Sequence, residues 1–110
     1  MRETIILVHG ALMTGKVMAV LGWRMNRCGF RTVIFDYPTR RQSLRENAGL
    51  LARFARKLDA ERVHLVGHSL GGMVILRALQ LEPGMPPGRV LLLGTPVRGS
   101  GVAQRLYSRA

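Results

Sequence analysis

The stretch that decides the fold is Arg62-Val-His-Leu-Val-Gly67-His68-Ser69-Leu70-Gly71-Gly72-Met73-Val-Ile-Leu-Arg77-Ala-Leu79. Its first five residues have strand character, and an apolar helical pattern begins directly behind the serine. The segment from Gly67 to Gly71 fits the pattern G-x-S-x-G, which is typical of a nucleophile elbow. The glycines on either side of such a strained turn let the strand and the helix pass closely. This pattern predicts that the Ser69 hydroxyl is a nucleophile beside the amide-rich start of a helix.

The alternative is a glycine-rich turn with an incidental serine, because five-residue matches of this kind are common. The required context, a strand before the motif and a helix after it, is present and favours the catalytic interpretation.

The bulk composition predicts one globular domain over residues 1–110, with 47% apolar residues and a modest core. The longest apolar run is too short to span a membrane, and Met1-Arg-Glu-Thr4 leads straight into a strand without a signal-peptide layout. We therefore expect a cytoplasmic protein. The single cysteine, Cys28, excludes an internal disulfide and is expected to be a small buried hydrophobe on a packed helix.

The formal net charge is +11, and fifteen of the seventeen basic residues are arginine. They are scattered from Arg2 to Arg109, and no nucleic-acid reading motif accompanies them. We therefore expect solvated helix faces and no nucleic-acid partner. Weak attraction to anionic lipid or acidic substrates stays open.

The hydrophobic pattern along the chain alternates between strands and helices. We expect helices over 16–28, where Val17, Val20, Leu21 and Met25 share a face, and over 70–81. A further helix begins at the capping box Ser43-Leu-Arg-Glu46, and another is expected from Gly101. Strands are expected over 4–9, 31–35, 62–66 and 89–93, with continuous apolar runs. This order predicts a parallel, doubly wound α/β sheet of about four strands with flanking helices.

The pair His9-Gly10 follows the first expected strand, and Ser69 follows the third. Since the carboxyl ends of parallel strands meet at one edge, the two sequences should lie together there. An acyl-transfer serine needs two backbone donors for the oxyanion, and the expected donors are the amides of Leu70 and Ala11. The alternative is that Gly10 only lets the chain leave the strand.

With these residues in hand, the chain resembles an α/β-hydrolase of the lipase/esterase kind, close to small bacterial members that resemble GPI-inositol deacylases. The resemblance is carried by the segments Ile5–Gly10, Val63–Gly72 and Leu93–Ser100. It implies the strand order two-one-three-four and a partial α/β-hydrolase fold. It also implies a carboxylic-ester substrate, small or lipid, with no cofactor and no metal ion. Ser69 is then the nucleophile, and the residues expected to shape the site are His9, Gly10, Gly67, His68 and Gly71.

The sequence departs from that family after the nucleophile, where the triad acid and histidine should follow. Beyond Ser69 there is one acid, Glu82, and no histidine. In the family, the position of His68 does not supply the base and His9 shapes the oxyanion loop. His64 is five residues back along a strand, roughly 16 Å away. We therefore expect the N-terminal half of a hydrolase, inactive or nearly so by itself. Its last strand, 89–93, would be an apolar edge open to association.

Two other interpretations stay open. Gly10-Ala-Leu-Met-Thr-Gly15-Lys16 matches G-x-x-x-x-G-K between a strand and a helix, as in a phosphate-binding P-loop, and Asp36 ends the next strand. The match fails at Val17, where a Ser or Thr hydroxyl should reach the metal ion. The other interpretation is a catalytically dead fold that is used for binding or kept as a remnant.

Overall fold

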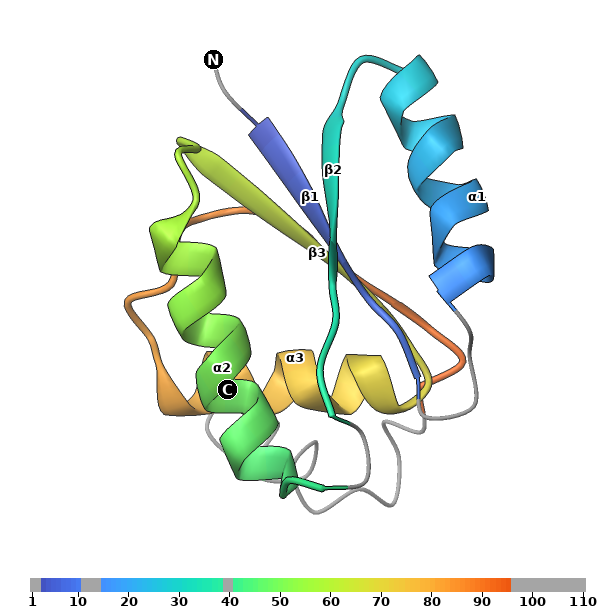
Figure 1. The fold of residues 1–110 in the computed structure, drawn as a ribbon. Coiled ribbons are helices and arrows are strands. Elements are labelled where there is room, and N and C mark those ends of the chain that lie inside the picture. Colours follow the sequence, from blue (N-terminus) through green and yellow to red (C-terminus); the bar gives the residue numbers. More distant parts are fainter. Residues whose placement is uncertain (1–2, 11–14, 39–40, 96–110) are drawn as a thin grey trace.

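The structure is a computed structural model that describes residues 3–10, 15–38 and 41–95. Its strands and helices alternate along the chain (Figure 1). The elements, in order, are β1 (Glu3–Val8), α1 (Gly15–Arg27), β2 (Arg31–Phe35), α2 (Leu44–Lys57), β3 (Arg62–His68), α3 (Leu70–Leu81) and β4 (Val90–Leu93). Every element expected before residue 96 is present, within two residues of its expected bounds. The helix expected from Gly101 lies outside the described residues.

The four strands form one parallel sheet in the order β2-β1-β3-β4, as the family resemblance predicted. Val8, the last residue of β1, pairs with Phe35 of β2 and with Gly67 of β3. On the other side of β3, His68 pairs with Leu93 of β4. All four strands therefore end at one edge of the sheet, and the residues that follow them are brought together there.

Helices cover both faces of the sheet, α1 on one face and α2 with α3 on the other (Figure 1). β1 is buried on both faces. Its residues Ile5 and Leu7 pack in one cluster with Met18 of α1. Ile6 and Val8 pack in the larger cluster, which contains Leu51 of α2, Val74 of α3 and other residues of those helices. This two-sided burial explains why β1 is a continuous apolar run with no alternation.

The capping box at the start of α2 is present, as predicted. The Ser43 hydroxyl accepts the N–H of Glu46 at 3.1 Å, and the Glu46 carboxylate accepts the N–H of Ser43 at 3.3 Å. Two amides at the helix start are thereby satisfied.

Two expectations for the segment after β1 are wrong. Cys28 is exposed, because α1 ends at Arg27 and the chain turns on the surface at Gly29, whose φ is 96°. In α1 itself, Val20 is 58% exposed and Met18 is buried in its place. The helix presents Met18, Leu21 and Met25 to the sheet, a spacing of three and four residues that excludes Val20.

Among the strands that the structure describes, β4 is the outermost on its side of the sheet, and it is only partly covered. Val90, Leu91 and Leu93 are 40%, 50% and 37% exposed. None of the helices in the described part of the chain has the length and apolarity needed to cross a bilayer.

Candidate active site

Ser69 occupies the sharp turn between β3 and α3. Its φ of 53° and ψ of −119° make it the one non-glycine residue with positive φ among residues 3–10, 15–38 and 41–95. An L-residue in this region is strained and persists only where the surrounding structure enforces it. Although Ser69 is the N-cap residue of α3, its side chain makes no capping hydrogen bond. The hydroxyl is therefore not used to stabilise the helix.

The end of β4 holds the strained turn from the other side. The Ser69 N–H donates to the Leu93 carbonyl at 2.9 Å, and the Thr95 hydroxyl donates to the Ser69 carbonyl at 3.1 Å. The same Ser69 carbonyl accepts the N–H of Gly72 at 3.0 Å. Both main-chain polar groups of Ser69 are thus satisfied in a conformation that the residue would not adopt alone.

The glycines of the motif are required by close approach. A β-carbon on Gly67 would lie 2.7 Å from the α-carbon of Gly72, so strand and helix would no longer fit. A β-carbon on Gly71 would lie 2.7 Å from the His9 carbonyl oxygen and would overlap the main chain of Val8. This is the physical reason for glycine on both sides of the serine.

His9 and Gly10 lie at the same edge as Ser69, as the sequence predicted. A β-carbon on Gly10 would be 3.1 Å from the β-carbon of Ser69 and 3.6 Å from the amide nitrogen of Leu70. The turn after β1 therefore runs close to both the candidate nucleophile and one of the two expected oxyanion donors. The other expected donor, Ala11, lies outside the described residues.

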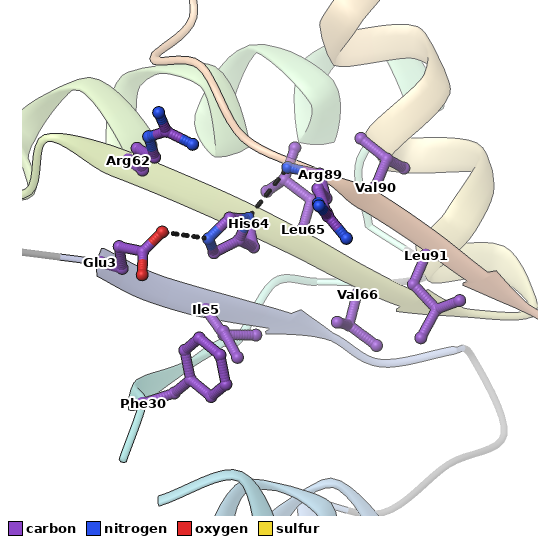
Figure 2. A pocket seen from close by; sticks show the side chains of 10 residues that line it. All are labelled: Glu3, Ile5, Phe30, Arg62, His64, Leu65, Val66, Arg89, Val90 and Leu91. Carbon is purple, nitrogen blue, oxygen red and sulfur yellow. Dashed lines mark hydrogen bonds and ion pairs between the residues drawn. The ribbon is translucent and has the colours of Figure 1, made fainter. Parts of the chain in front are cut away.

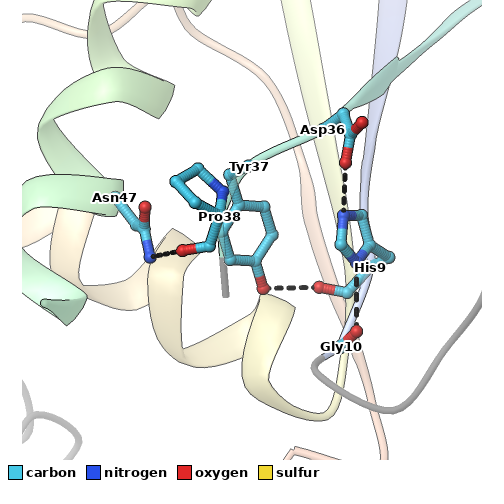
Figure 3. Close-up of polar contacts among 6 residues, drawn as sticks. All are labelled: His9, Gly10, Asp36, Tyr37, Pro38 and Asn47. Atoms are coloured by element: carbon cyan, nitrogen blue, oxygen red, sulfur yellow. Dashed lines mark hydrogen bonds and ion pairs between the residues drawn. The ribbon is translucent and has the colours of Figure 1, made fainter. Parts of the chain in front are cut away.

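His9 is buried and contacts three groups (Figure 3). Its Nδ1 is 3.0 Å from the Gly10 carbonyl oxygen, and its Nε2 is 3.2 Å from Oδ1 of Asp36. Its ring stacks on Tyr37 with a centroid distance of 4.7 Å, and the Tyr37 hydroxyl donates to the His9 carbonyl at 2.6 Å. Burial raises the pKa of Tyr37 to about 12, so its hydroxyl keeps the proton that it donates.

The other two histidines lie in different surroundings. His64 is engaged away from Ser69, with Nε2 3.2 Å from the Glu3 carboxylate and Nδ1 accepting the Arg89 N–H at 2.9 Å. His68 is half-buried, and its Nδ1 has no hydrogen-bond partner in the part of the chain that the structure describes.

A shallow pocket of about 470 Å³ lies on the sheet face that carries α1, and it does not include Ser69 (Figure 2). Its floor contains Ile5, Val66 and Leu91 from three neighbouring strands, and Arg62 and Arg89 lie beside it. The pocket is therefore distinct from the edge where the candidate site residues gather.

A comparison with protein families identifies the chain. The sequence model described as the alpha/beta hydrolase family matches residues 5–110. The chain belongs to the alpha/beta hydrolase family. This assignment decides against the P-loop interpretation of residues 10–16. The comparison with curated proteins gives no match for this chain.

Solved structures of lipases and esterases are similar to this hydrolase chain. It matches the monoacylglycerol lipase of Paleococcus ferrophilus with a TM-score of 0.72 and 26% identity, over 89% of this chain and 40% of that one. It matches the mature form of the Bacillus licheniformis lipase BlEst2 with a TM-score of 0.70 and 28% identity, over 97% and 46%. Polyneuridine aldehyde esterase, 20% identical over 99% and 48% with a TM-score of 0.67, shares the fold. The chain thus spans about half the length of these structures, or less.

Sequence reasoning did not assign Asp36, Tyr37 or Thr95 to this site, and it considered Asp36 only for the P-loop interpretation. The first two follow β2, which is paired with β1, so their position after a strand end was a usable signal. Thr95 belongs to the turn quoted for the family resemblance, but nothing in the sequence showed that its hydroxyl would contact Ser69.

Proposed function

We propose that this chain carries the nucleophile and the oxyanion site of a carboxylic-ester hydrolase of the lipase/esterase type. The observation that supports it most directly is the conformation of Ser69, a strained residue whose hydroxyl has no structural hydrogen bond at the helix start. Strain of this kind at a strand–helix turn is typical of a nucleophile elbow. The family assignment and the similarity to two lipases at 26% and 28% identity agree with this proposal.

In the proposed reaction the Ser69 oxygen attacks the ester carbonyl carbon and the hydroxyl proton passes to a base. The carbonyl oxygen becomes an oxyanion, which the amides of Leu70 and Ala11 stabilise. Each such donor contributes about 3 kcal/mol to transition-state stabilisation. The alcohol then leaves with a proton, and water hydrolyses the acyl-enzyme.

The base and its acid partner are proposed to come from a part of the hydrolase beyond these 110 residues. Glu82, the single acid after Ser69, pairs with Arg56 at 3.4 Å at the far end of α3. The rings of His9 and His64 are each held by other groups. Without a base, oxyanion stabilisation and binding leave roughly 10³–10⁴-fold acceleration over water.

The test is covalent labelling of the 110-residue chain with a fluorophosphonate, followed by peptide mass spectrometry. We expect a slow adduct on Ser69 that is absent from Ser69→Ala and unchanged in Ser43→Ala, the matched serine at a helix start. Hydrolysis of a p-nitrophenyl ester by the same chain should stay near background. An adduct on another residue, or none, would contradict the nucleophile proposal. Robust turnover that Ser69→Ala abolishes would contradict the proposal that the base lies elsewhere.

A further inference from the structure

Asp36 and Tyr37, the two residues that follow β2, hold His9 by its side chain and by its main chain. β2 pairs with β1 in register, with Phe35 opposite Val8, so both residues emerge beside His9. Asp36 contacts the ring Nε2 at 3.2 Å, and the Tyr37 hydroxyl donates to the His9 carbonyl at 2.6 Å (Figure 3). The stacked Tyr37 ring covers one side of the imidazole.

His9 in turn holds the peptide unit on which the oxyanion site depends. Its Nδ1 contacts the Gly10 carbonyl oxygen at 3.0 Å. This contact restrains the carbonyl of Gly10 and with it the planar peptide unit to which the carbonyl belongs. Gly10 itself runs close to Ser69 and Leu70, since a β-carbon on it would lie 3.1 Å from the Ser69 β-carbon and 3.6 Å from the Leu70 nitrogen. A displacement of His9 would therefore be transmitted to the candidate oxyanion site.

The two ring contacts of His9 fix the orientation of its imidazole. The Gly10 carbonyl oxygen and the Asp36 carboxylate oxygen are both acceptors, and they lie at opposite nitrogens of the ring. The ring is buried, with an exposed fraction of 11%, whereas the Asp36 side chain is 93% exposed. Solvent screens a carboxylate in that position, so its contribution is mainly the orientation of the ring.

We propose that Asp36 and Tyr37 are positioning residues of the oxyanion turn, which is formed by His9 and Gly10. They keep the Gly10 peptide at the distance from Ser69 and Leu70 that a bound oxyanion needs. This inference rests on the proposed ester hydrolase function, which assigns Ser69 and the Leu70 amide their roles.

The test compares Asp36→Asn, Asp36→Ala and Tyr37→Phe with the wild-type chain. Tyr37→Phe keeps the stacked ring and removes only the hydroxyl, and Asp36→Asn keeps an acceptor oxygen and removes the charge. Glu82→Gln is the matched control, because it removes the carboxylate of another surface ion pair far from the site. One readout is the rate of Ser69 labelling by excess fluorophosphonate. The other is two-dimensional ¹H–¹⁵N NMR of the His9 ring and of the amides of Gly10 and Leu70.

We expect Asp36→Ala and Tyr37→Phe each to lower the labelling rate roughly 10-fold, less than the roughly 100-fold loss of a whole donor. Asp36→Asn should lie between Asp36→Ala and wild type. The His9 ring nitrogens and both amides should shift in these variants, whereas Glu82→Gln should move neither readout. A purely structural role would lower the melting temperature without changing the labelling rate of the folded fraction.

The outcomes separate this inference from the function on which it rests. If the wild-type chain forms no Ser69 adduct, the proposed function is wrong, and the NMR arm still decides whether Asp36 and Tyr37 position the turn. In the other case Ser69 is labelled, but the variants have the same labelling rate and the same Gly10 and Leu70 resonances as Glu82→Gln. That result would overturn the positioning proposal and leave the proposed function in place.

Discussion

Gly71, at the start of α3, lies against the main chain of His9 at the end of β1. A β-carbon on Gly71 would come within 2.7 Å of the His9 carbonyl oxygen, the same oxygen that accepts the Tyr37 hydroxyl. The helix that follows the serine and the turn after β1 are thus in direct main-chain contact.

This contact predicts that Gly71→Ala destabilises the chain, because neither main-chain segment can move without breaking sheet or helix hydrogen bonds. We expect the free energy of unfolding in urea to fall by about 3 kcal/mol, the upper range for overpacking. Gly84→Ala is the control, since a β-carbon there meets nothing within 4 Å. It should change stability by less than about 0.5 kcal/mol. Equal effects of the two substitutions would refute the close-contact explanation.

The strained backbone of Ser69 predicts that glycine at this position gives a more stable protein than alanine does. Glycine tolerates φ 53° and ψ −119°, but alanine does not, so Ser69→Gly should be more stable than Ser69→Ala by about 1 kcal/mol. Urea denaturation of the two variants measures this difference, and both should lose fluorophosphonate labelling. If Ser69→Ala is the more stable of the two, the residue is not strained.

The capping box predicts the effect of Ser43→Ala. The substitution removes the acceptor for the Glu46 amide, and we expect a loss of about 1 kcal/mol in unfolding free energy. Ser43→Asp keeps a side-chain acceptor and serves as the control, with stability close to wild type. A loss in Ser43→Asp as large as in Ser43→Ala would show that the hydrogen bond is not the cause.

The buried hydroxyl of Tyr37 predicts an alkaline loss of stability. Burial raises its pKa from 10.0 to about 12, so the unfolded chain releases this proton at lower pH than the folded chain does. The stability that the protonated Tyr37 hydroxyl adds to the folded chain is complete below pH 10. It is lost as the pH rises from 10.0 to about 12. Unfolding free energies at several alkaline pH values should therefore fall more steeply for wild type than for Tyr37→Phe. Parallel curves would contradict this.

The exposed apolar side chains of β4 predict association of the 110-residue chain. β4 has no charge or proline within Val90–Leu93, and such edges pair with other chains. We expect Leu91→Lys to shift the chain toward monomer in light scattering, because it places a charge on the edge. Val20→Lys changes an exposed apolar residue on α1 and should leave association unchanged. A wild-type chain that is monomeric at all concentrations would contradict the prediction.

The sequence was sufficient for the elements and the sheet because the apolar strands are continuous and the turns carry strong glycine signals. It was insufficient for α1, where Val17, Val20 and Leu21 allow a face that includes Val20 as well as one that excludes it. It was also insufficient for Cys28, because a helix limit shifted by one residue moves a side chain from the packed helix to the surface.

The contacts within the site were less predictable than its location. Strand order placed His9 and Ser69 at one edge, but a sequence does not show which loop side chains turn inward. The contact between His9 and Asp36, and the one between Thr95 and Ser69, depend on side-chain directions that only the three-dimensional structure gives.

The common register of β1, β2 and β3 determines where this protein can change its length during evolution. Val8 is paired with Phe35 and with Gly67, so His9, Asp36 and His68 follow in phase, and Ser69 comes directly after His68. A single inserted or deleted residue in any of the three strands would turn every later side chain of that strand to the opposite face. Length variation among homologues should therefore collect in the connections at the amino ends of the strands, over 28–30, 58–61 and 82–88.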